Sequence, residues 1–113
     1  MQKQITVQEA EDLQSEYINT RSSVIDLALG YSDIRNFNFS LEELKEYIKI
    51  VEDYGNANGH EDMGITIFMG AYNVNTDDQP KATVFLAPTR DNGDIINKDV
   101  EPLNLAKPGG NDY

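Results

Sequence analysis

The chain contains one histidine, His60, and no cysteine, and these two facts restrict the chemistry it could perform. The pair His60-Glu61 opens like a zinc-binding helix, but the second histidine of that motif is absent from the residues that follow. A zinc site built on one histidine would require several carboxylates as further ligands. A serine hydrolase would need His60 as its base, and the sequence has no Gly-x-Ser-x-Gly elbow to carry the nucleophile. We therefore predict no catalytic residue, and we interpret His60 as an exposed loop residue.

Residues 73–78, NVNTDD, are the best candidate for a cation-binding loop, because their first positions have the spacing of an EF-hand. The sixth position of that loop is Asp78 where the motif needs glycine, and the twelfth is Val84 where it needs glutamate. A phosphate-binding loop is not indicated either, because the sequence lacks the Gly-Lys-Ser/Thr ending of that motif. The sequence therefore predicts no metal and no cofactor.

The chain is strongly acidic, with 20 acidic residues against nine lysines and arginines and a formal net charge of −11. Residues 1–62 have a net charge of −8, and residues 63–113 have −3. Such a surface repels nucleic-acid phosphates and anionic membranes, and it would attract a basic protein. No apolar run approaches the ~20 residues of a membrane helix, and the start, MQKQITVQEA, lacks the apolar core of a signal peptide. We expect a cytoplasmic protein with no nucleic-acid or membrane partner.

Two helices are expected to begin at capping boxes, in which the first side chain accepts from the fourth backbone amide and the fourth side chain reaches back. These boxes are Thr6-Val-Gln-Glu9 and Ser40-Leu-Glu-Glu43. Apolar residues recur at helical spacing after each box: Val7, Ala10, Leu13 and Tyr17 after the first, and Leu41, Leu44, Ile48 and Val51 after the second. The second helix should end near residues 55–59, where glycine and asparagine suit a left-handed cap.

The segment between these helices is less regular. Residues 20–31, TRSSVIDLALGY, allow either a short helix ended by Gly30 or a buried strand. Leucine and alanine outweigh the β-branched residues near its end, which favours the helix. The alternation of Phe37 and Phe39 with asparagines then predicts a short strand with one buried face.

The stretches GITIFMGAY (64–72) and KATVFLAPT (81–89) predict an antiparallel hairpin between residues 64 and 88. We expect an α+β fold in which two or three helices pack on one face of this small sheet, with the aliphatic face as the covered one. Gly70 is expected at a bulge or a close backbone approach. The aliphatic face carries Ile65, Ile67, Met69, Ala71, Val84 and Leu86, and the aromatic face carries Thr66, Phe68, Gly70, Tyr72, Thr83, Phe85 and Ala87.

The remainder of the chain is expected to complete a single domain, residues 1–113. The loop of residues 73–80 is too long for a tight turn, so its register is open. Ile95 and Ile96 follow a turn signal at Asn92-Gly93 and are expected to add a short strand. A flexible C-terminal tail is expected from about residue 105.

Four stretches, FSLEELKEYI, GITIFMGAY, TVFLAPT and PLNLAKPGG, resemble a group of small uncharacterised bacterial proteins. The resemblance covers about residues 35–110. It departs at Leu105-Ala106, where the group carries an aromatic and a small residue. The resemblance implies the same architecture, and it implies no catalytic residue because the group has no known activity.

The candidate binding residues are Phe68, Tyr72 and Phe85 on the aromatic face and the two arginines Arg35 and Arg90 near the rim. The C-terminal segment, a second subunit or water could cover the aromatic face, and either arginine could instead form a local ion pair. The leading hypothesis is a non-enzymatic protein-binding or self-associating module, with a protein partner or a homodimer. The alternatives are an acidic inhibitor or immunity-type protein for a basic partner, and a small-molecule binder or small enzyme with a deep pocket.

Overall fold

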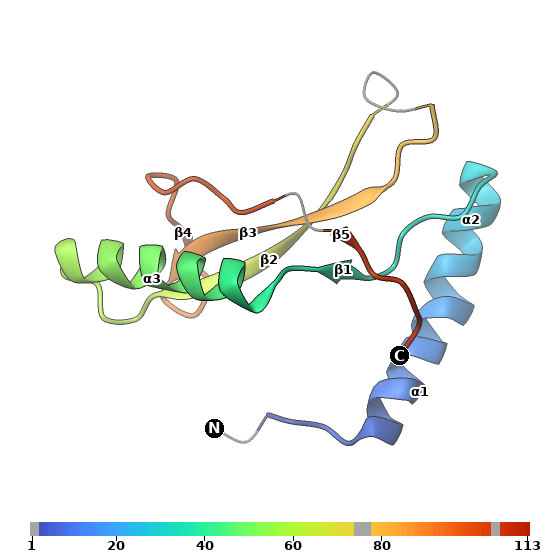
Figure 1. The fold of residues 1–113 in the computed structure, drawn as a ribbon, viewed down its shortest axis with the longest axis horizontal. Coiled ribbons are helices and arrows are strands. Elements are labelled where there is room, and N and C mark those ends of the chain that lie inside the picture. Colours follow the sequence, from blue (N-terminus) through green and yellow to red (C-terminus); the bar gives the residue numbers. More distant parts are fainter. Residues whose placement is uncertain (1–2, 74–77, 105–106) are drawn as a thin grey trace.

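The computed structural model of the chain describes residues 3–73, 78–104 and 107–113, which are arranged as Figure 1 shows. The α+β class and the hairpin predicted from the sequence are confirmed. In chain order the elements are α1 (Val7–Tyr17), η1 (Ile18–Ser22, a π-helix), α2 (Ser23–Leu29), β1 (Phe37–Asn38), α3 (Leu41–Ala57), β2 (Gly64–Ala71), β3 (Ala82–Arg90), β4 (Ile95–Ile96) and β5 (Lys107–Pro108).

Elements α1, η1 and α2 follow one another without a break and form a helical arm, residues 7–29, that extends away from the sheet (Figure 1). The arm begins at the predicted capping box, where Glu9 N donates to Thr6 Oγ1 at 3.0 Å and Thr6 N donates to Glu9 Oε1 at 3.2 Å. It ends at Gly30, whose φ of +83° is left-handed. At 1.5 Å per residue the arm is about 35 Å long.

The segment 20–31 is therefore helical up to Leu29, as the sequence favoured, and it continues the first helix through a π-turn. At this turn the hydroxyls of Thr20 and Ser23 donate to carbonyl oxygens four residues earlier, at 2.6 and 2.9 Å. Such back-bonding competes with the helical hydrogen-bond ladder and bends helices. The back-bonding accompanies the change from α-helix to π-helix at Ile18–Ser22, and the arm continues through this turn into α2.

Strands β2 and β3 pair antiparallel along the whole of β2, from Gly64 opposite Thr89 to Ala71 opposite Ala82. Strand β4 pairs with the end of β3 and confirms the predicted short strand. Strands β1 and β5 form a separate two-stranded sheet. The ladder continues through Gly70, and a Cβ there would make only ordinary contacts of 3.5 Å or more. The expected bulge or close approach at Gly70 is therefore wrong, because the regular ladder needs neither.

The core lies between α3 and one end of the hairpin. Tyr47 and Val51 of α3 contact Leu86 of β3, and all three are buried. The half-buried residues around them are Phe39, Leu44, Met63, Ile65 and Leu103. The Tyr47 hydroxyl lies 3.2 Å from the Leu86 carbonyl oxygen and 3.0 Å from that of Glu101, so it ties the helix to β3 and to the following loop. Burial raises the pKa of Tyr47.

Gly55 allows the chain to turn back closely after α3. A Cβ at this position would lie 2.6 Å from Met63 Cγ and 2.9 Å from the His60 carbonyl oxygen. We expect Gly55→Ala to lower the free energy of unfolding by about 1–3 kcal/mol, because the loop must shift to make room. Chemical denaturation measures this, with Gly70→Ala as the matched control. Equal effects of the two substitutions would contradict the close approach at Gly55.

Candidate functional site

Helix α3 covers the aliphatic face of the hairpin at one end only. Ile65 and Leu86 belong to the core, whereas Ile67 and Met69 on the same face are 66% and 68% exposed. The prediction that helices shield this face is therefore wrong for its Ile67–Met69 part. The physical reason is that the arm, which could have covered it, lies away from the sheet (Figure 1).

An apolar groove borders the exposed residues. Its volume is about 410 Å³, and one polar side chain, Asn38, contributes to its wall. Its lining residues come from β1, α3 and the hairpin: Phe37, Asn38, Phe39, Leu44, Ile67, Val84 and Leu86. We call this groove, together with Ile67 and Met69, the open face.

Residues of the aromatic face partly cover one another. Phe68 and Phe85 lie opposite each other in the ladder, and their rings stack with centroids 5.1 Å apart and an interplanar angle of 12°. Both residues are half-buried, and Thr83 and Ala87 on the same face of β3 are buried. Tyr72, just beyond β2, is 41% exposed. Two of the three predicted aromatic residues, Phe68 and Phe85, therefore shield part of each other's apolar surface from water.

The predicted rim of arginines and Tyr72 does not form one surface. Arg90 is the last residue of β3, and Tyr72 follows the opposite end of the β2–β3 ladder. At ~3.3 Å per residue the two positions are more than about 20 Å apart. Arg90 Nε is buried without a hydrogen-bond partner among the described residues. Arg35 lies on another part of the chain, in the contact described next.

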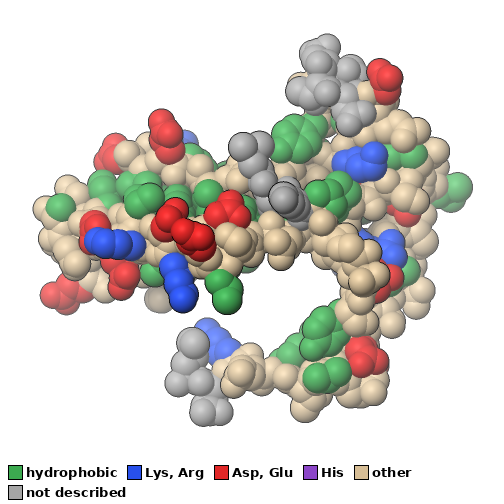
Figure 2. Space-filling view, viewed as in Figure 1, with side chains coloured by type: hydrophobic (Ala, Val, Ile, Leu, Met, Phe, Trp, Pro, Cys, Tyr) green, Lys and Arg blue, Asp and Glu red, His purple; other side chains and the backbone are tan. Residues whose placement is uncertain are grey.

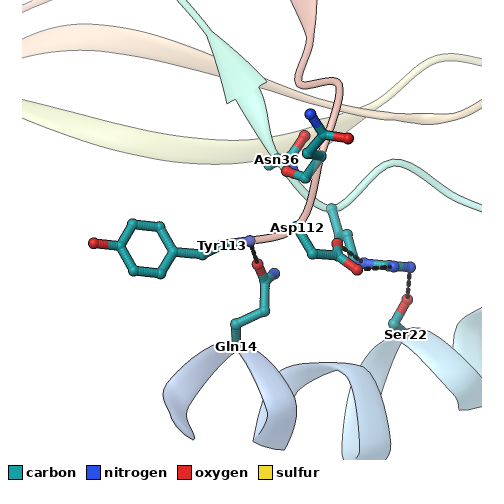
Figure 3. Close-up of polar contacts among 7 residues, drawn as sticks. Gln14, Ser22, Asn36, Asp112 and Tyr113 are labelled. Atoms are coloured by element: carbon teal, nitrogen blue, oxygen red, sulfur yellow. Dashed lines mark hydrogen bonds and ion pairs between the residues drawn. The ribbon is translucent and has the colours of Figure 1, made fainter. Parts of the chain in front are cut away.

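The C-terminal residues hold the arm through a set of polar contacts that we call the clasp (Figure 3). Arg35 donates from Nε and Nη2 to the two carboxylate oxygens of Asp112, at 2.9 and 2.8 Å. Arg35 Nη1 donates to Ser22 Oγ in the arm at 3.3 Å, and Tyr113 N donates to Gln14 Oε1 at 2.6 Å. Within the tail for which the sequence predicts flexibility, Asp112 and Tyr113 make these contacts. Arg35 lowers the pKa of Asp112.

A second set of contacts fixes the connection between the arm and the sheet. Asp33 N donates to Asp26 Oδ1 at 2.8 Å, and Asp33 Oδ1 accepts from Ala82 N at the start of β3, also at 2.8 Å. The hydroxyl of Tyr31 donates to the carbonyl oxygen of Pro80. These hydrogen bonds attach the arm to the sheet through residues 30–34, which we call the hinge.

The arm exposes large apolar side chains although it is firmly attached. Leu27 is 85% exposed, and Ser22 is the one buried residue among those described in the arm. Figure 2 shows hydrophobic side chains on the arm beside the deep notch that separates it from α3. The large exposed apolar residues of the arm are Val7, Leu13, Val24, Leu27 and Leu29.

The surroundings of His60 and of the acidic side chains bear on a possible metal site. Among residues 3–73, 78–104 and 107–113, no three histidine, cysteine or acidic side chains come close enough to hold a metal ion. His60 is half-buried, with its ring 6.3 Å from that of Tyr54, so the prediction of an exposed loop histidine is wrong. The EF-hand-like loop lies mostly outside the described residues. Within the described part of the chain, no helix is long and apolar enough to cross a membrane.

Comparison with known proteins assigns no family. No family model matches the chain. No curated protein and no solved structure matches it either. The function must therefore be inferred from the surfaces of the chain itself.

The chain exposes far more surface than a folded monomer of its size. Its accessible area is 8600 Å², whereas a monomer of 12.7 kDa typically exposes about 6,200 Å². Its radius of gyration is 16.5 Å, against about 13 Å for a compact chain of this length. The arm and the open face contribute seven of the large apolar side chains that remain exposed, among them Leu27, Met69 and Ile67.

Proposed function

We propose that the chain is a non-enzymatic protein-interaction module that binds a polypeptide on the open face and on the exposed side of the arm. The observation that carries this proposal is the surplus of about 2,400 Å² of accessible surface over a compact monomer. Soluble monomers rarely expose contiguous apolar patches larger than a few hundred Å². The cytoplasm, where the sequence places the chain, is the proposed location.

The composition of the groove favours a polypeptide over a small molecule. Its volume of about 410 Å³ is within the range of ligand sites, but such sites combine apolar walls with several convergent polar groups. Asn38 is the one polar side chain in its lining. Met69 extends the apolar surface beyond the groove, as an interface between proteins requires.

A binding test uses an environment-sensitive apolar dye with the dilute, full-length chain. We expect the dye to bind, and we expect Ile67→Ser combined with Met69→Ser to remove most of that binding. Ile96→Ser in β4 is the matched control, because Ile96 is also exposed but lies outside the open face. Equal dye binding by the double variant and the wild type would contradict the assignment of the open face.

An acidic inhibitor of a basic protein is the second candidate, and the net charge of −11 favours it. Binding driven by charge loses strength steeply as salt rises, because the Debye length falls from ~10 Å at 0.1 M to ~3 Å at 1 M. Binding through the open face is expected to persist at 1 M salt. The salt dependence of a captured complex therefore separates the two candidates.

A further inference from the structure

We infer that the partner of the open face is the arm of a second copy of this chain, so that two copies exchange arms in a symmetric dimer. This inference rests on the proposed function and names its partner. It follows from four properties of the chain: the size of the surplus surface, the presence of two unpartnered apolar surfaces, their lengths, and the way in which the arm is held.

The surplus surface has the size of a permanent interface. An excess of about 2,400 Å² per chain corresponds to about 4,800 Å² buried by two chains, within the range of obligate homodimers. A transient contact with a small partner buries less than about 1,200 Å² in total and would leave most of the surplus uncovered.

The same chain carries both halves of a complementary contact. The arm presents Leu13, Val24 and Leu27, and the sheet presents the open face with Ile67 and Met69. Two-fold symmetry makes any contact between two different patches occur twice, because each copy both donates its arm and receives one. The two symmetric copies of the arm-to-sheet contact therefore cover both arms and both open faces of the dimer.

The arm is long enough to span the open face. The arm is about 35 Å long, and the β2–β3 ladder, formed by the eight residues of β2, is about 26 Å long. One arm can therefore run along the whole open face, including the groove beside α3.

The clasp and the hinge hold the arm away from the sheet of its own chain. Closing the arm onto that sheet would break the hydrogen bonds that join it to the clasp, from Arg35 Nη1 to Ser22 Oγ at 3.3 Å and from Tyr113 N to Gln14 Oε1 at 2.6 Å. Exchange with a second copy leaves these bonds intact. The hydrogen bonds that orient the arm thus favour contact between chains over closure within one chain.

Charge adds an independent signature of this dimer. Two copies that each carry −11 repel one another at low salt. Dimerisation is therefore expected to strengthen as salt rises from 0.05 to about 0.5 M. An acidic chain that binds a basic partner shows the opposite dependence.

Cross-linking between two single-cysteine variants tests the exchange, because the wild-type chain has no cysteine. Leu13→Cys and Met69→Cys both replace exposed residues. An equimolar mixture treated with a bis-maleimide of about 10 Å span is expected to give mainly the mixed product of two chains. A separate measurement without cross-linker uses the variant Leu13→Glu, which is expected to weaken dimerisation at least about tenfold. Ser15→Glu, at an exposed position of the arm, is the charge-matched control.

Each other product overturns the exchange in a distinguishable way. If Leu13→Cys cross-links mainly to itself, the two copies meet arm to arm. If only the double variant Leu13→Cys/Met69→Cys reacts, within one chain, the arm folds onto its own sheet, and the proposed function fails as well. If neither product forms, the surfaces stay open in a lone chain; the exchange then fails, while the proposed function remains for a different partner.

Discussion

Leu86→Ala is expected to lower the free energy of unfolding by about 2–5 kcal/mol, because it removes a buried side chain at the centre of the core. That loss is a large share of the roughly 5–15 kcal/mol that stabilise a typical domain. Denaturant unfolding at several protein concentrations measures it. Most of the loss should already appear in a dilute, monomeric sample, because Leu86 contacts Tyr47 and Val51 of its own chain.

Ile67→Ala is the matched control, because Ile67 lies directly opposite Leu86 in the ladder but is 66% exposed. In a dilute, monomeric sample its cost should stay below about 1 kcal/mol, since an exposed side chain loses little contact on truncation. At concentrations at which the dimer forms, the cost should rise, because the partner's arm covers Ile67. A large cost at every concentration would contradict the open face, and a small cost at every concentration would contradict the exchange.

Tyr47→Ala is the second substitution with a large expected effect, a loss of about 3–5 kcal/mol, because it removes a buried ring from the α3 side of the core. Tyr47→Phe separates the ring from the hydroxyl. It should cost about 1–2 kcal/mol, because two carbonyl oxygens within 3.2 Å then lose their shared donor. Equal effects of the two substitutions would contradict the role of the ring in the core.

The same residue produces a pH dependence. The pKa of Tyr47 is raised above its ordinary value of 10.0 by burial, so the folded chain keeps the proton at a pH where the unfolded chain has lost it. The stabilising contribution is therefore complete below pH 10 and is lost as the pH rises through the folded pKa. Unfolding measured between pH 9 and pH 11 should show a weaker pH dependence for Tyr47→Phe than for the wild type.

Local signals in the sequence predicted most of the secondary structure. The two capping boxes mark the first turns of the arm and of α3, because they satisfy backbone groups within four residues of each other. The hairpin follows from two apolar runs of matched length. The π-turn was not predicted, since the back-bonds of Thr20 and Ser23 depend on side-chain rotamers that a spacing pattern does not contain.

The candidate site depended on contacts between distant residues, and here the sequence was a poorer guide. The period-two pattern identified both faces of the hairpin, but it does not state how far α3 extends over one of them. The partner of Arg35 is Asp112, 77 residues away, and no local pattern links the two. The sequence left open what covers Phe68 and Phe85, because the stacking that shields them arises only once the register is set.

The position of the arm was the largest difference from expectation. Helical spacing predicts that an apolar stripe packs against another surface, and the expected surface was the sheet of the same chain. The structure instead attaches the arm through polar groups of the clasp and the hinge. The apolar residues of the arm therefore stay exposed, which the composition of the helix alone could not indicate.

Small-angle scattering of the wild-type chain, combined with light scattering over a range of concentrations, tests the central claim most directly. The exchange of arms predicts a particle of twice the 12.7 kDa of one chain, which dissociates on dilution and re-forms at higher salt. A particle with the mass of one chain and a radius of gyration near 13 Å at every concentration would contradict it, because such a chain would have closed its arm over its own open face.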